Sequence, residues 1–198
     1  MSDPLPPACD VLVIGAGPAG CSAALYAASA GCAVLLVDRA APRRDKICGD
    51  ALTPRAVYLL AQLGIGPPDL RAAGAQEVAA LVRHRADGAV ASATLPGGPG
   101  LAPRAFGLPR RNLDALLWQR AAAGGVQLRS HCRVAAVRVD DTSGGQGIAV
   151  RLRQAGQERT VAAGVAILAV GSASALPGRL GFAPRRAAWG IGVRQYFV

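Results

Sequence analysis

The stretch Cys9-Asp10-Val11-Leu12-Val13-Ile14-Gly15-Ala16-Gly17-Pro18-Ala19-Gly20 decides the fold of this chain. Its apolar residues 11–14 predict a short strand that runs into G-x-G-x-x-G, and the alanine-rich residues 21–30 predict a helix behind it. The first glycine permits a tight turn, the second lets backbone approach a pyrophosphate, and the third lets helix and strand pack closely. The pattern predicts a dinucleotide-binding turn, with candidate contacts at Gly15, Gly17, Pro18, Ala19 and Gly20.

A second predicted strand, residues 33–37, ends at Asp38, eighteen residues after Gly20. An acidic side chain there is placed to accept hydrogen bonds from ribose hydroxyls and would repel a 2′-phosphate. The N-terminus of the intervening helix offers unpaired N–H groups and a positive dipole end to the phosphates. Strand, turn, helix, second strand and acid occur in the required order, which makes the signal far more specific than a glycine-rich turn alone. The adjacent Arg39 joins the candidate contacts.

Composition narrows the class of protein. The 198 residues are 52% apolar and 17% charged, which is typical of one globular core or of one domain with an insertion. The net charge is +10, and nearly all of the positively charged residues are arginines, because Lys46 is the only lysine. The arginines are scattered and aromatic residues are few, so we expect no nucleic-acid partner. Attraction to an anionic membrane surface stays open.

Cysteine usage and hydropathy bear on the compartment. The five cysteines are odd in number and show neither C-x-x-C nor zinc spacing, so we expect a reducing compartment and no metal site. Residues 1–8 lack the apolar core of a signal peptide, and no apolar run is long enough to cross a bilayer. We therefore expect a cytoplasmic protein, either freely soluble or peripheral at the membrane.

The remainder of the chain is expected to be a mixture of strands and helices. Thr53-Pro54 predicts a helix start, with threonine as the cap and proline at the first helical position. The expected elements are a loop over 40–50, this helix ending at Gly64, a connection over 66–74, strands over 76–85 and 89–95, a turn-rich stretch over 96–103, a helix over 112–123, strands over 126–129, 133–139, 147–153 and 158–162, a strand buried on both faces over 165–170, and a last strand over 191–198.

One strand in this series indicates the variant of the fold. Ile148, Val150 and Leu152 alternate with more polar positions, as in a half-buried antiparallel strand. An NAD-binding Rossmann domain would continue with alternating strands and helices, whereas a β-meander here favours a flavin-binding variant. The expected fold class is α/β: a Rossmann-like FAD-binding domain over 1–198, with an inserted mixed β region over 66–108 and a β-meander.

Two motifs resemble a known family. The run Arg44-Asp45-Lys46-Ile47-Cys48-Gly49-Asp50-Ala51-Leu52-Thr53-Pro54-Arg55-Ala56-Val57 closely resembles a motif of the geranylgeranyl reductases. These are FAD-dependent enzymes that reduce isoprenoid double bonds, and they include reductases acting on menaquinone side chains. Arg110-Arg111-Asn112-Leu113-Asp114 resembles the family's R-x-x-(F/L)-D at a helix start, and residues 190–197 are similar to a strand after the first half of the flavin domain. Aromatic hydroxylases and flavin-dependent halogenases share this fold.

The resemblance implies a set of FAD contacts. The glycine turn would approach the pyrophosphate, and Asp38 would hold the adenosine ribose. Arg110 would reach toward the phosphates or the ribityl chain, since a planar cation suits anionic oxygen. A solvated arginine at a helix start is its structural alternative. Cys48 and Gly49 would lie near the isoalloxazine ring, although a small buried apolar role fits Cys48 almost as well. Val134 and Gly171 complete the set.

No catalytic residue follows from these patterns. His84 and His131, the only histidines, each stand beside arginines and are expected at the surface. The chain departs from the family twice: Val170 stands where the family has the acid of A-D-G, and family members are about twice as long, beyond one ordinary domain. We therefore expect a truncated, N-terminal half of the family fold.

Three functions are consistent with the sequence. The leading hypothesis is an FAD-dependent oxidoreductase that passes hydride from NAD(P)H through FAD to an isoprenoid double bond. The first alternative is a flavin-dependent monooxygenase or halogenase of the same fold. The second is a non-catalytic FAD-binding fragment that needs a partner chain to supply the other half.

Overall fold

The computed structural model describes residues 4–95, 97–142, 145–172 and 174–182, together with Val193 and Gln195. The described chain divides into two compact units, one made of residues 4–44 with 117–182 and the other of residues 45–116. The second unit contains the region over 66–108 that the sequence marks as an insertion. The last predicted strand, over 191–198, lies outside the described residues apart from Val193 and Gln195.

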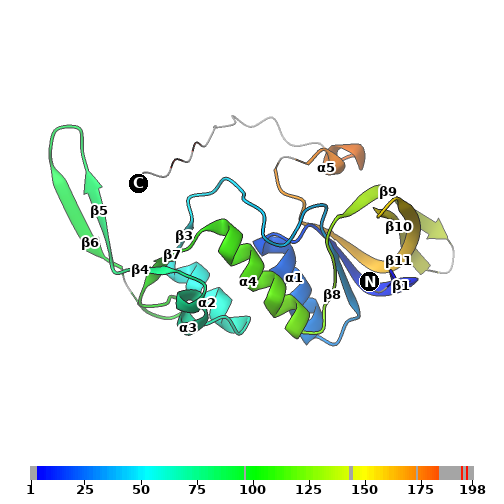
Figure 1. The fold of residues 1–198 in the computed structure, drawn as a ribbon, viewed down its shortest axis with the longest axis horizontal. Helices are drawn as coiled ribbons and strands as arrows, with labels where there is room; N and C mark the ends of the chain where they lie inside the picture. The colour runs from blue at the N-terminus through cyan, green and yellow to red at the C-terminus, as the bar shows by residue number, and fades with distance from the viewer. Residues whose placement is uncertain are drawn as a thin grey trace. The chain divides into compact units, whose positions relative to one another are not determined.

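The first unit is built on a six-stranded sheet in the order β8-β2-β1-β11-β10-β9 (Figure 1). Its strands are β1 (Ala8–Ile14), β2 (Val34–Val37), β8 (Gln127–Arg129), β9 (Cys132–Thr142), β10 (Gly145–Gln154) and β11 (Gln157–Leu168). The first four strands of the order run parallel, and β10 and β9 continue antiparallel. The predicted combination of a parallel nucleotide-binding sheet with a β-meander is confirmed.

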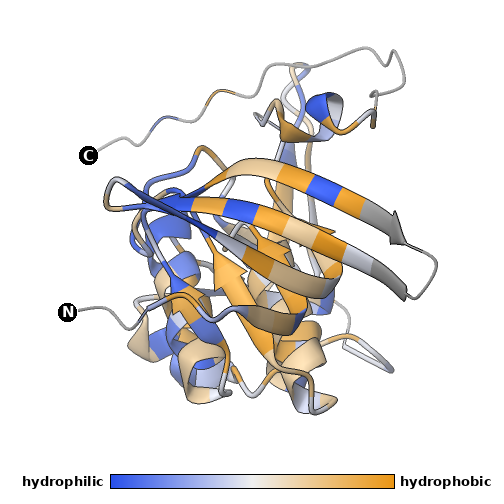
Figure 2. Cartoon of the chain, turned by 90° about the vertical axis from the view of Figure 1, so that its right-hand side faces the viewer, coloured by the Kyte–Doolittle hydropathy of each residue, from blue (hydrophilic) through white to orange (hydrophobic). Residues whose placement is uncertain are grey.

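Apolar side chains of the central strands form the core of this unit. Leu12 and Leu35 are fully buried, as are Val150 and Leu152 of the predicted half-buried strand. Figure 2 shows the alternating blue and orange along the two long strands that end in grey, β9 and β10. Helix α1 (Pro18–Ser29) contacts β1 and β2 and contributes the buried Cys21 and Ala24. Burial of this apolar surface holds the turn between β1 and α1 in place.

The predicted strands over 158–162 and 165–170 are one continuous strand, β11. The prediction that its second half is buried on both faces was wrong, because Val165 is 53% exposed. Parallel pairing with β1 gives this segment hydrogen-bonded neighbours along its edges, but it does not supply a layer over each face. An unbroken apolar run therefore did not distinguish pairing from burial.

The second unit combines short strands and helices. Strands β3 (Ala51–Leu52), β7 (Ala105–Gly107) and β4 (Gln76–Val78) form a three-stranded antiparallel sheet, and β5 (Ala80–His84) pairs with β6 (Val90–Thr94) in a hairpin. The predicted strand over 76–85 is thus divided between two sheets at Ala79, and β7 was not predicted. Both strands of the hairpin are exposed along their whole length.

Two helices precede these strands. Helix α2 (Pro54–Gln62) begins as predicted, since the Thr53 hydroxyl accepts a hydrogen bond from the Ala56 N–H at 3.3 Å and Pro54 is the first helical residue. The predicted connection over 66–74 instead contains helix α3 (Pro67–Ala72). Its prolines occupy the first turn, where a missing N–H costs nothing, and the Asp69 carboxylate accepts the Gly66 N–H at 2.7 Å.

Two further helices complete the described chain. Helix α4 (Arg110–Ala123) starts two residues before the predicted boundary and buries Leu113, Leu117 and Ala121, spaced four residues apart. The short helix α5 (Leu176–Arg179) follows β11. Because α4 begins at Arg110, the predicted cofactor contact at this residue stands in the first turn of the helix.

Candidate cofactor-binding site

The turn between β1 and α1 has a backbone that glycine alone accommodates. Gly15 has φ +105°, and a Cβ built on it would lie 2.4 Å from the Ala169 carbonyl oxygen. At Gly20 a Cβ would lie 1.7 Å from the Gly15 carbonyl oxygen, so the first turn of α1 rests directly on the end of β1. Hydrogen bonds from Gly15 N–H to Val37 and from Ala169 N–H to Ile14, both 2.8 Å, join the turn to neighbouring strands.

The N-terminus of α1 suits an anion. Gly17 is the residue before the first helical position, Pro18 follows it, and the first turn carries no acidic side chain. A capping side chain is thus absent at Gly17, and backbone N–H groups of this turn remain for a ligand. The Arg44 guanidinium lies beside the turn, because a Cβ at Gly17 would be 3.8 Å from Arg44 Nη2. The arrangement fits the negatively charged pyrophosphate of a dinucleotide.

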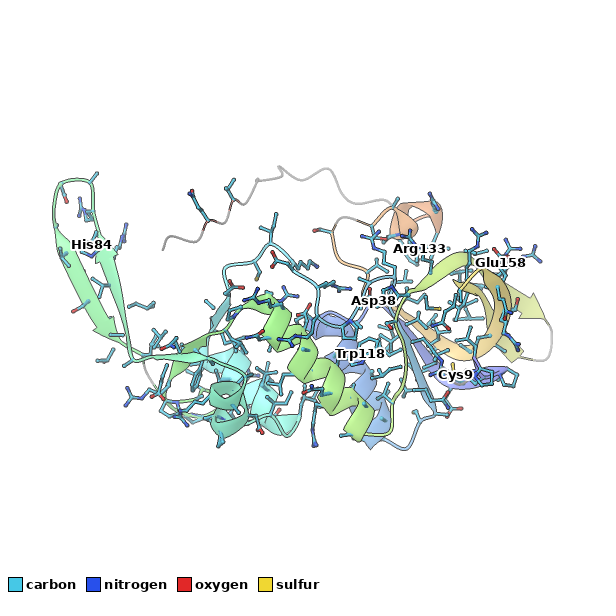
Figure 3. All side chains as sticks on the ribbon, in the orientation of Figure 1. Cys9, Asp38, His84, Trp118, Arg133 and Glu158 are labelled. Atoms are coloured by element: carbon cyan, nitrogen blue, oxygen red, sulfur yellow. The ribbon has the colours of Figure 1, made fainter. Side chains whose placement is uncertain are left out.

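Asp38 stands at the end of β2 and is buried (Figure 3). Its Oδ2 accepts the Ala16 N–H at 2.7 Å, its Oδ1 accepts the Ala40 N–H at 2.8 Å, and the Arg44 guanidinium lies 2.5 Å from the same Oδ1. Burial alone would raise the pKa of Asp38, but these hydrogen bonds and the Arg44 charge outweigh it and hold the pKa below its usual range. The carboxylate is therefore ionised and joined to the glycine turn.

A second cluster lies in the other unit, at the start of α4. Arg110 and Asp114 are 9% and 1% exposed and form a two-pronged ion pair, with Nε to Oδ1 at 3.0 Å and Nη2 to Oδ2 at 3.2 Å. The Arg110 guanidinium also hydrogen bonds to the Cys48 thiol. This contact, with N–H groups of Asp50 and Gly49, holds the pKa of Cys48 below its usual value despite some burial.

The other candidate contacts remain predictions. Arg39 and Gly49 are exposed, and Gly171 has φ +76°, which matches a backbone position that favours glycine. Val134 is partly buried and packs against the core of the first unit. The side chain of Val170, which stands in place of the family's acid, packs against the same core. It therefore offers no polar group to a ligand.

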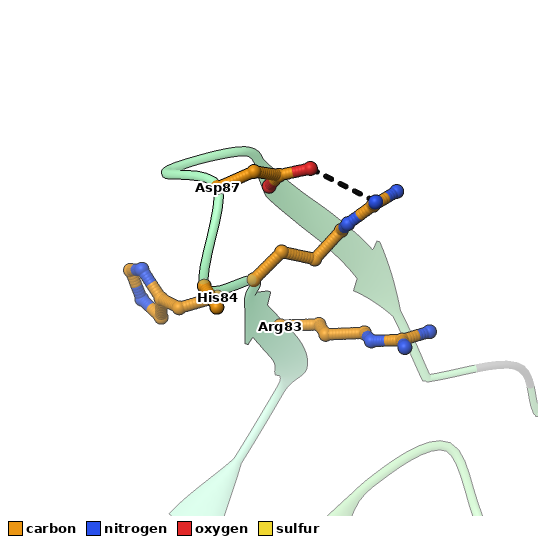
Figure 4. A pocket seen from close by; sticks show the side chains of 5 residues that line it. Arg83, His84 and Asp87 are labelled. Carbon is orange, nitrogen blue, oxygen red and sulfur yellow. Dashed lines mark ion pairs between the residues drawn. The ribbon is translucent and has the colours of Figure 1, made fainter.

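Both histidines are exposed, as predicted. His84 lies in the hairpin, in a surface hollow lined by residues 83–87, and its imidazole points away from Arg83 (Figure 4). Arg85 and Asp87 form an ion pair of 2.8 Å in the same hollow. In the parts of the chain that the structure describes, no group of three or more His, Cys, Asp or Glu side chains is arranged for a metal ion.

Sequence analysis missed three residues that shape these clusters. Arg44 and Asp50 lie in the motif that carries the family resemblance, but no spacing rule links them to their partners. Asp50 accepts the Arg110 N–H on its Oδ1 at 3.0 Å, and its carbonyl accepts the Leu108 N–H at 2.8 Å. Asp114 did have a signal, since it stands four residues after Arg110, the spacing of ion pairs along a helix.

The glycine turn, the ionised acid at the end of the second strand and the antiparallel extension of the sheet define a flavoprotein of the dinucleotide-binding type. Residues 8–191 match the model of the FAD binding domain family, and the chain belongs to that family. It is an FAD-binding module. The part of the chain that the structure describes contains no helix long and apolar enough to cross a membrane.

Named relatives agree with this assignment. The chain is 37% identical over 194 residues to a menaquinone reductase of Mycolicibacterium smegmatis, a match that covers 96% of this chain and 44% of the relative. It is 37% identical over 129 residues to digeranylgeranylglycerophospholipid reductase 1 of Methanopyrus kandleri, covering 63% of this chain and 30% of the relative. The structure of a myxobacterial chondrochloren halogenase, an FAD-dependent enzyme, superposes with a TM-score of 0.73 at 26% identity, covering 85% of this chain and 38% of that one. The chain thus spans less than half the length of these proteins.

Proposed function

We propose that this chain is the FAD-binding part of an oxidoreductase that uses NAD(P)H to saturate an isoprenoid double bond. The observation that carries the proposal is the glycine turn, in which added Cβ atoms at Gly15 and Gly20 would collide with backbone, joined to the ionised Asp38. The two reductase relatives and the motif over 44–57 support the choice of reaction.

Each part of the site has a distinct task in this proposal. Backbone N–H groups of the α1 N-terminus and the Arg44 guanidinium would bind the pyrophosphate, and Asp38 would accept hydrogen bonds from the adenosine ribose. Arg110 would face an anionic oxygen of the cofactor, and Cys48 and Gly49 would lie near the flavin ring. FAD supplies the hydride chemistry when bound, while the protein supplies position and electrostatics.

The first experiment is a binding measurement on the 198-residue chain. Its visible absorption spectrum is recorded before and after denaturation, and FAD-free protein is then titrated with FAD, FMN and riboflavin. The turn and Asp38 engage the adenosine diphosphate part, so we expect stoichiometric FAD and at least about tenfold weaker FMN binding, a difference of about 1.4 kcal/mol. Equal affinity for FAD and riboflavin, or no binding of either, would overturn the assignment of the turn.

The reaction itself requires a second test on a polypeptide of the relatives' length. Anaerobic mixing with NADH or NADPH should bleach the flavin absorbance, and an isoprenoid substrate should restore it with a two-hydrogen gain in product mass. A requirement for the other half, on the same polypeptide or on a partner chain, is part of the proposal. Stimulation by anionic vesicles would support a peripheral membrane location in the cytoplasm.

One specific observation favours a monooxygenase or halogenase as the second candidate: the FAD-dependent halogenase superposes over most of this chain. In that case NAD(P)H oxidation would consume oxygen, and the product would gain oxygen or halogen rather than hydrogen. A non-catalytic fragment is the third candidate. Val170 supports it, because an apolar side chain stands where family members carry an acid. Tight FAD binding with no bleaching by either nicotinamide in the longer polypeptide would favour it.

A further inference from the structure

The hairpin of β5 and β6 is a two-stranded sheet without a neighbouring strand. Its strands pair with each other, and no third strand of the described chain joins them (Figure 1). Every residue of both strands is exposed. An isolated two-stranded hairpin is at best marginally stable in water, and three or more strands with an apolar face are needed for independent stability. The hairpin therefore has the character of an incomplete sheet.

Both faces of the hairpin carry apolar side chains. Successive residues of a strand point to opposite faces, and cross-strand partners share a face. The register thus places Leu81, Ala91 and Ala93 on one face. Val82 and Val90 lie on the opposite face, and Leu81, Val82 and Val90 are 62%, 57% and 60% exposed. Apolar residues on both faces are typical of a strand with cover on both sides, whereas a sheet with one face in water alternates apolar and polar residues.

The backbone of each strand presents unpaired groups at the outer edge of the hairpin. Two hydrogen bonds, from Arg85 N–H to Ala89 at 2.9 Å and from Leu95 N–H to Ala79 at 3.1 Å, fix the phase of the antiparallel pattern. In this pattern, hydrogen-bonded pairs alternate with pairs whose N–H and C=O groups point away from the partner strand. The outward-pointing residues are Ala80, Val82 and His84 of β5 and Val90, Ser92 and Thr94 of β6.

Neither edge carries the features that keep edge strands of natural proteins from pairing. Those features include proline, lysine, inward-pointing charge and β-bulges. The two strands contain no proline and no lysine, their pairing has no shift in register, and Arg83 is their only permanently charged residue. Both edges are therefore open to the addition of a further strand, in which backbone hydrogen bonds supply affinity and alternate side chains supply specificity.

The length of the relatives indicates what covers this surface. The match with the Mycolicibacterium smegmatis menaquinone reductase covers 44% of that protein, so more than half of the relative lies outside the shared part. A polypeptide of that size can both add strands to an edge and cover an apolar face. A second copy of the hairpin, paired edge to edge, would leave both faces exposed. Lipid chains cannot pair with backbone N–H and C=O groups at all.

We propose that the β5–β6 hairpin is the docking surface for the remaining half of the family fold, which adds at least one strand to an edge of the hairpin and covers an apolar face. The segment that docks is an extended strand with apolar side chains at alternate positions, supplied on the same polypeptide or by a partner chain. The proposal rests on the proposed function only in so far as that function requires the other half. It goes further by assigning a surface to it.

The test compares the 198-residue chain with a fusion in which the part of the Mycolicibacterium smegmatis reductase that follows the match continues the chain after Val198. Hydrogen exchange is followed by mass spectrometry with electron-transfer fragmentation, which resolves single amides. We expect the outward-pointing amides of one edge to exchange at least about tenfold more slowly in the fusion than in the 198-residue chain. Amides of β1, which pairs with β2 and β11, provide the internal reference.

Proline substitutions identify the edge that receives the strand. Val82→Pro and Ser92→Pro each remove one outward-pointing N–H and none of the hydrogen bonds within the hairpin, a position at which strands tolerate proline. Val82→Ala and Ser92→Ala keep the N–H and serve as matched controls. In the fusion, we expect proline at one of the two positions, but not alanine there, to abolish the additional protection of that edge.

Several results would overturn the proposal. One is a folded fusion whose outward-pointing amides exchange as fast as in the 198-residue chain, and another is protection that both prolines leave intact. Protection that appears on dimerisation of the 198-residue chain, or only with vesicles of anionic phospholipid, would assign the surface to a second copy or to a membrane instead.

A fusion that fails to fold leaves the decision to the 198-residue monomer. Outward-pointing amides protected there as strongly as those of β1 would show that the hairpin needs no further strand, whereas fast exchange supports an open edge. FAD binding is measured separately on both polypeptides. A fusion that protects the hairpin but binds no FAD would refute the proposed function alone, and one that binds FAD with an unprotected hairpin would refute this proposal alone.

Discussion

Substitution of Gly20 by alanine sets two effects of opposite sign against each other. Gly20 is the third residue of α1, and alanine in a helix interior is favoured over glycine by about 1 kcal/mol. The added Cβ, however, would lie 1.7 Å from the Gly15 carbonyl oxygen, 2.9 Å from its carbon and 3.2 Å from Ala169 Cβ. The 1.7 Å distance to the Gly15 oxygen is roughly half of an ordinary van der Waals separation. Both Gly15 atoms belong to the backbone, so no side chain can rotate away to relieve the collision.

The backbone of the turn must therefore move by more than an ångström, or the helix must lift from the strand. Overpacking of this kind costs about 1–3 kcal/mol and occasionally more, and a contact of 1.7 Å with backbone puts this site at the upper end, at about 3–4 kcal/mol. After the helix gain of about 1 kcal/mol is subtracted, we expect Gly20→Ala to lower the free energy of unfolding by about 2–3 kcal/mol. For a domain of this size, that corresponds to a fall of roughly 4–12 °C in Tm. FAD affinity should fall as well, because in the proposed function the same turn would bind the pyrophosphate.

Urea unfolding followed by circular dichroism measures the first quantity, and FAD titration measures the second. The matched control is Gly147→Ala in β10 of the same unit, where a Cβ meets nothing within 4 Å and φ is not left-handed. This control should change stability by less than about 0.5 kcal/mol. A Gly20→Ala chain as stable as the unmodified one, with an unchanged slope of unfolding against urea, would refute the close-packing argument.

Three further expectations concern individual side chains. Asp38→Asn should cost about 1–3 kcal/mol, because the buried Ala16 N–H, Ala40 N–H and Arg44 lose an ionised acceptor; urea unfolding at pH 7 checks this. Folding lowers the pKa of Asp38, so the stabilisation from its carboxylate is complete above the unfolded pKa of about 4 and is lost as the pH falls toward the folded pKa. Asp38→Asn should lack this part of the loss of stability in acid. Unfolding free energies measured against pH for both chains check this, and identical curves would contradict it. Thr53→Ala should cost about 1 kcal/mol through loss of the α2 cap, with Thr53→Ser restoring most of it in the same assay; equal stability of all three chains would show that the 3.3 Å contact contributes nothing.

Local sequence patterns predicted the nucleotide-binding turn because its residues are constrained mainly by neighbours close by in the sequence. Gly15 and Gly20 are required by contacts within a short span of chain and with the adjacent strand, and Thr53-Pro54 marks its helix by capping alone. Helix α3 was not predicted, because its two prolines and Gly66 are typical of a connection between elements. They are equally compatible with a first helical turn once Asp69 caps it.

Non-local features could not be predicted in the same way. The partner of Asp38 is Arg44, six residues on in a loop without periodicity, so only the folded path of that loop brings them together. The partner of Cys48 lies sixty-two positions away at Arg110. The exposure of Val165 depends on which layers cover the sheet, a property of the assembled unit that the apolar run over 165–170 does not encode.

The hydrogen bonds of the turn bear on where cofactor affinity originates. Asp38 Oδ2 is held by the Ala16 N–H, inside the glycine turn itself, so the acid and the turn are fixed relative to each other by the chain alone. Folding already orders these groups, so a ligand that binds there does not have to order them, which is the general basis of preorganised binding. Under the proposed function, a ribose hydroxyl that approaches Oδ1 would compete with Arg44 for this oxygen, and a displaced Arg44 would stand beside Gly17, where the pyrophosphate charge would attract it. We therefore expect recognition of the ribose and of the phosphates to be coupled through Arg44, so that the loss of one contact weakens the other.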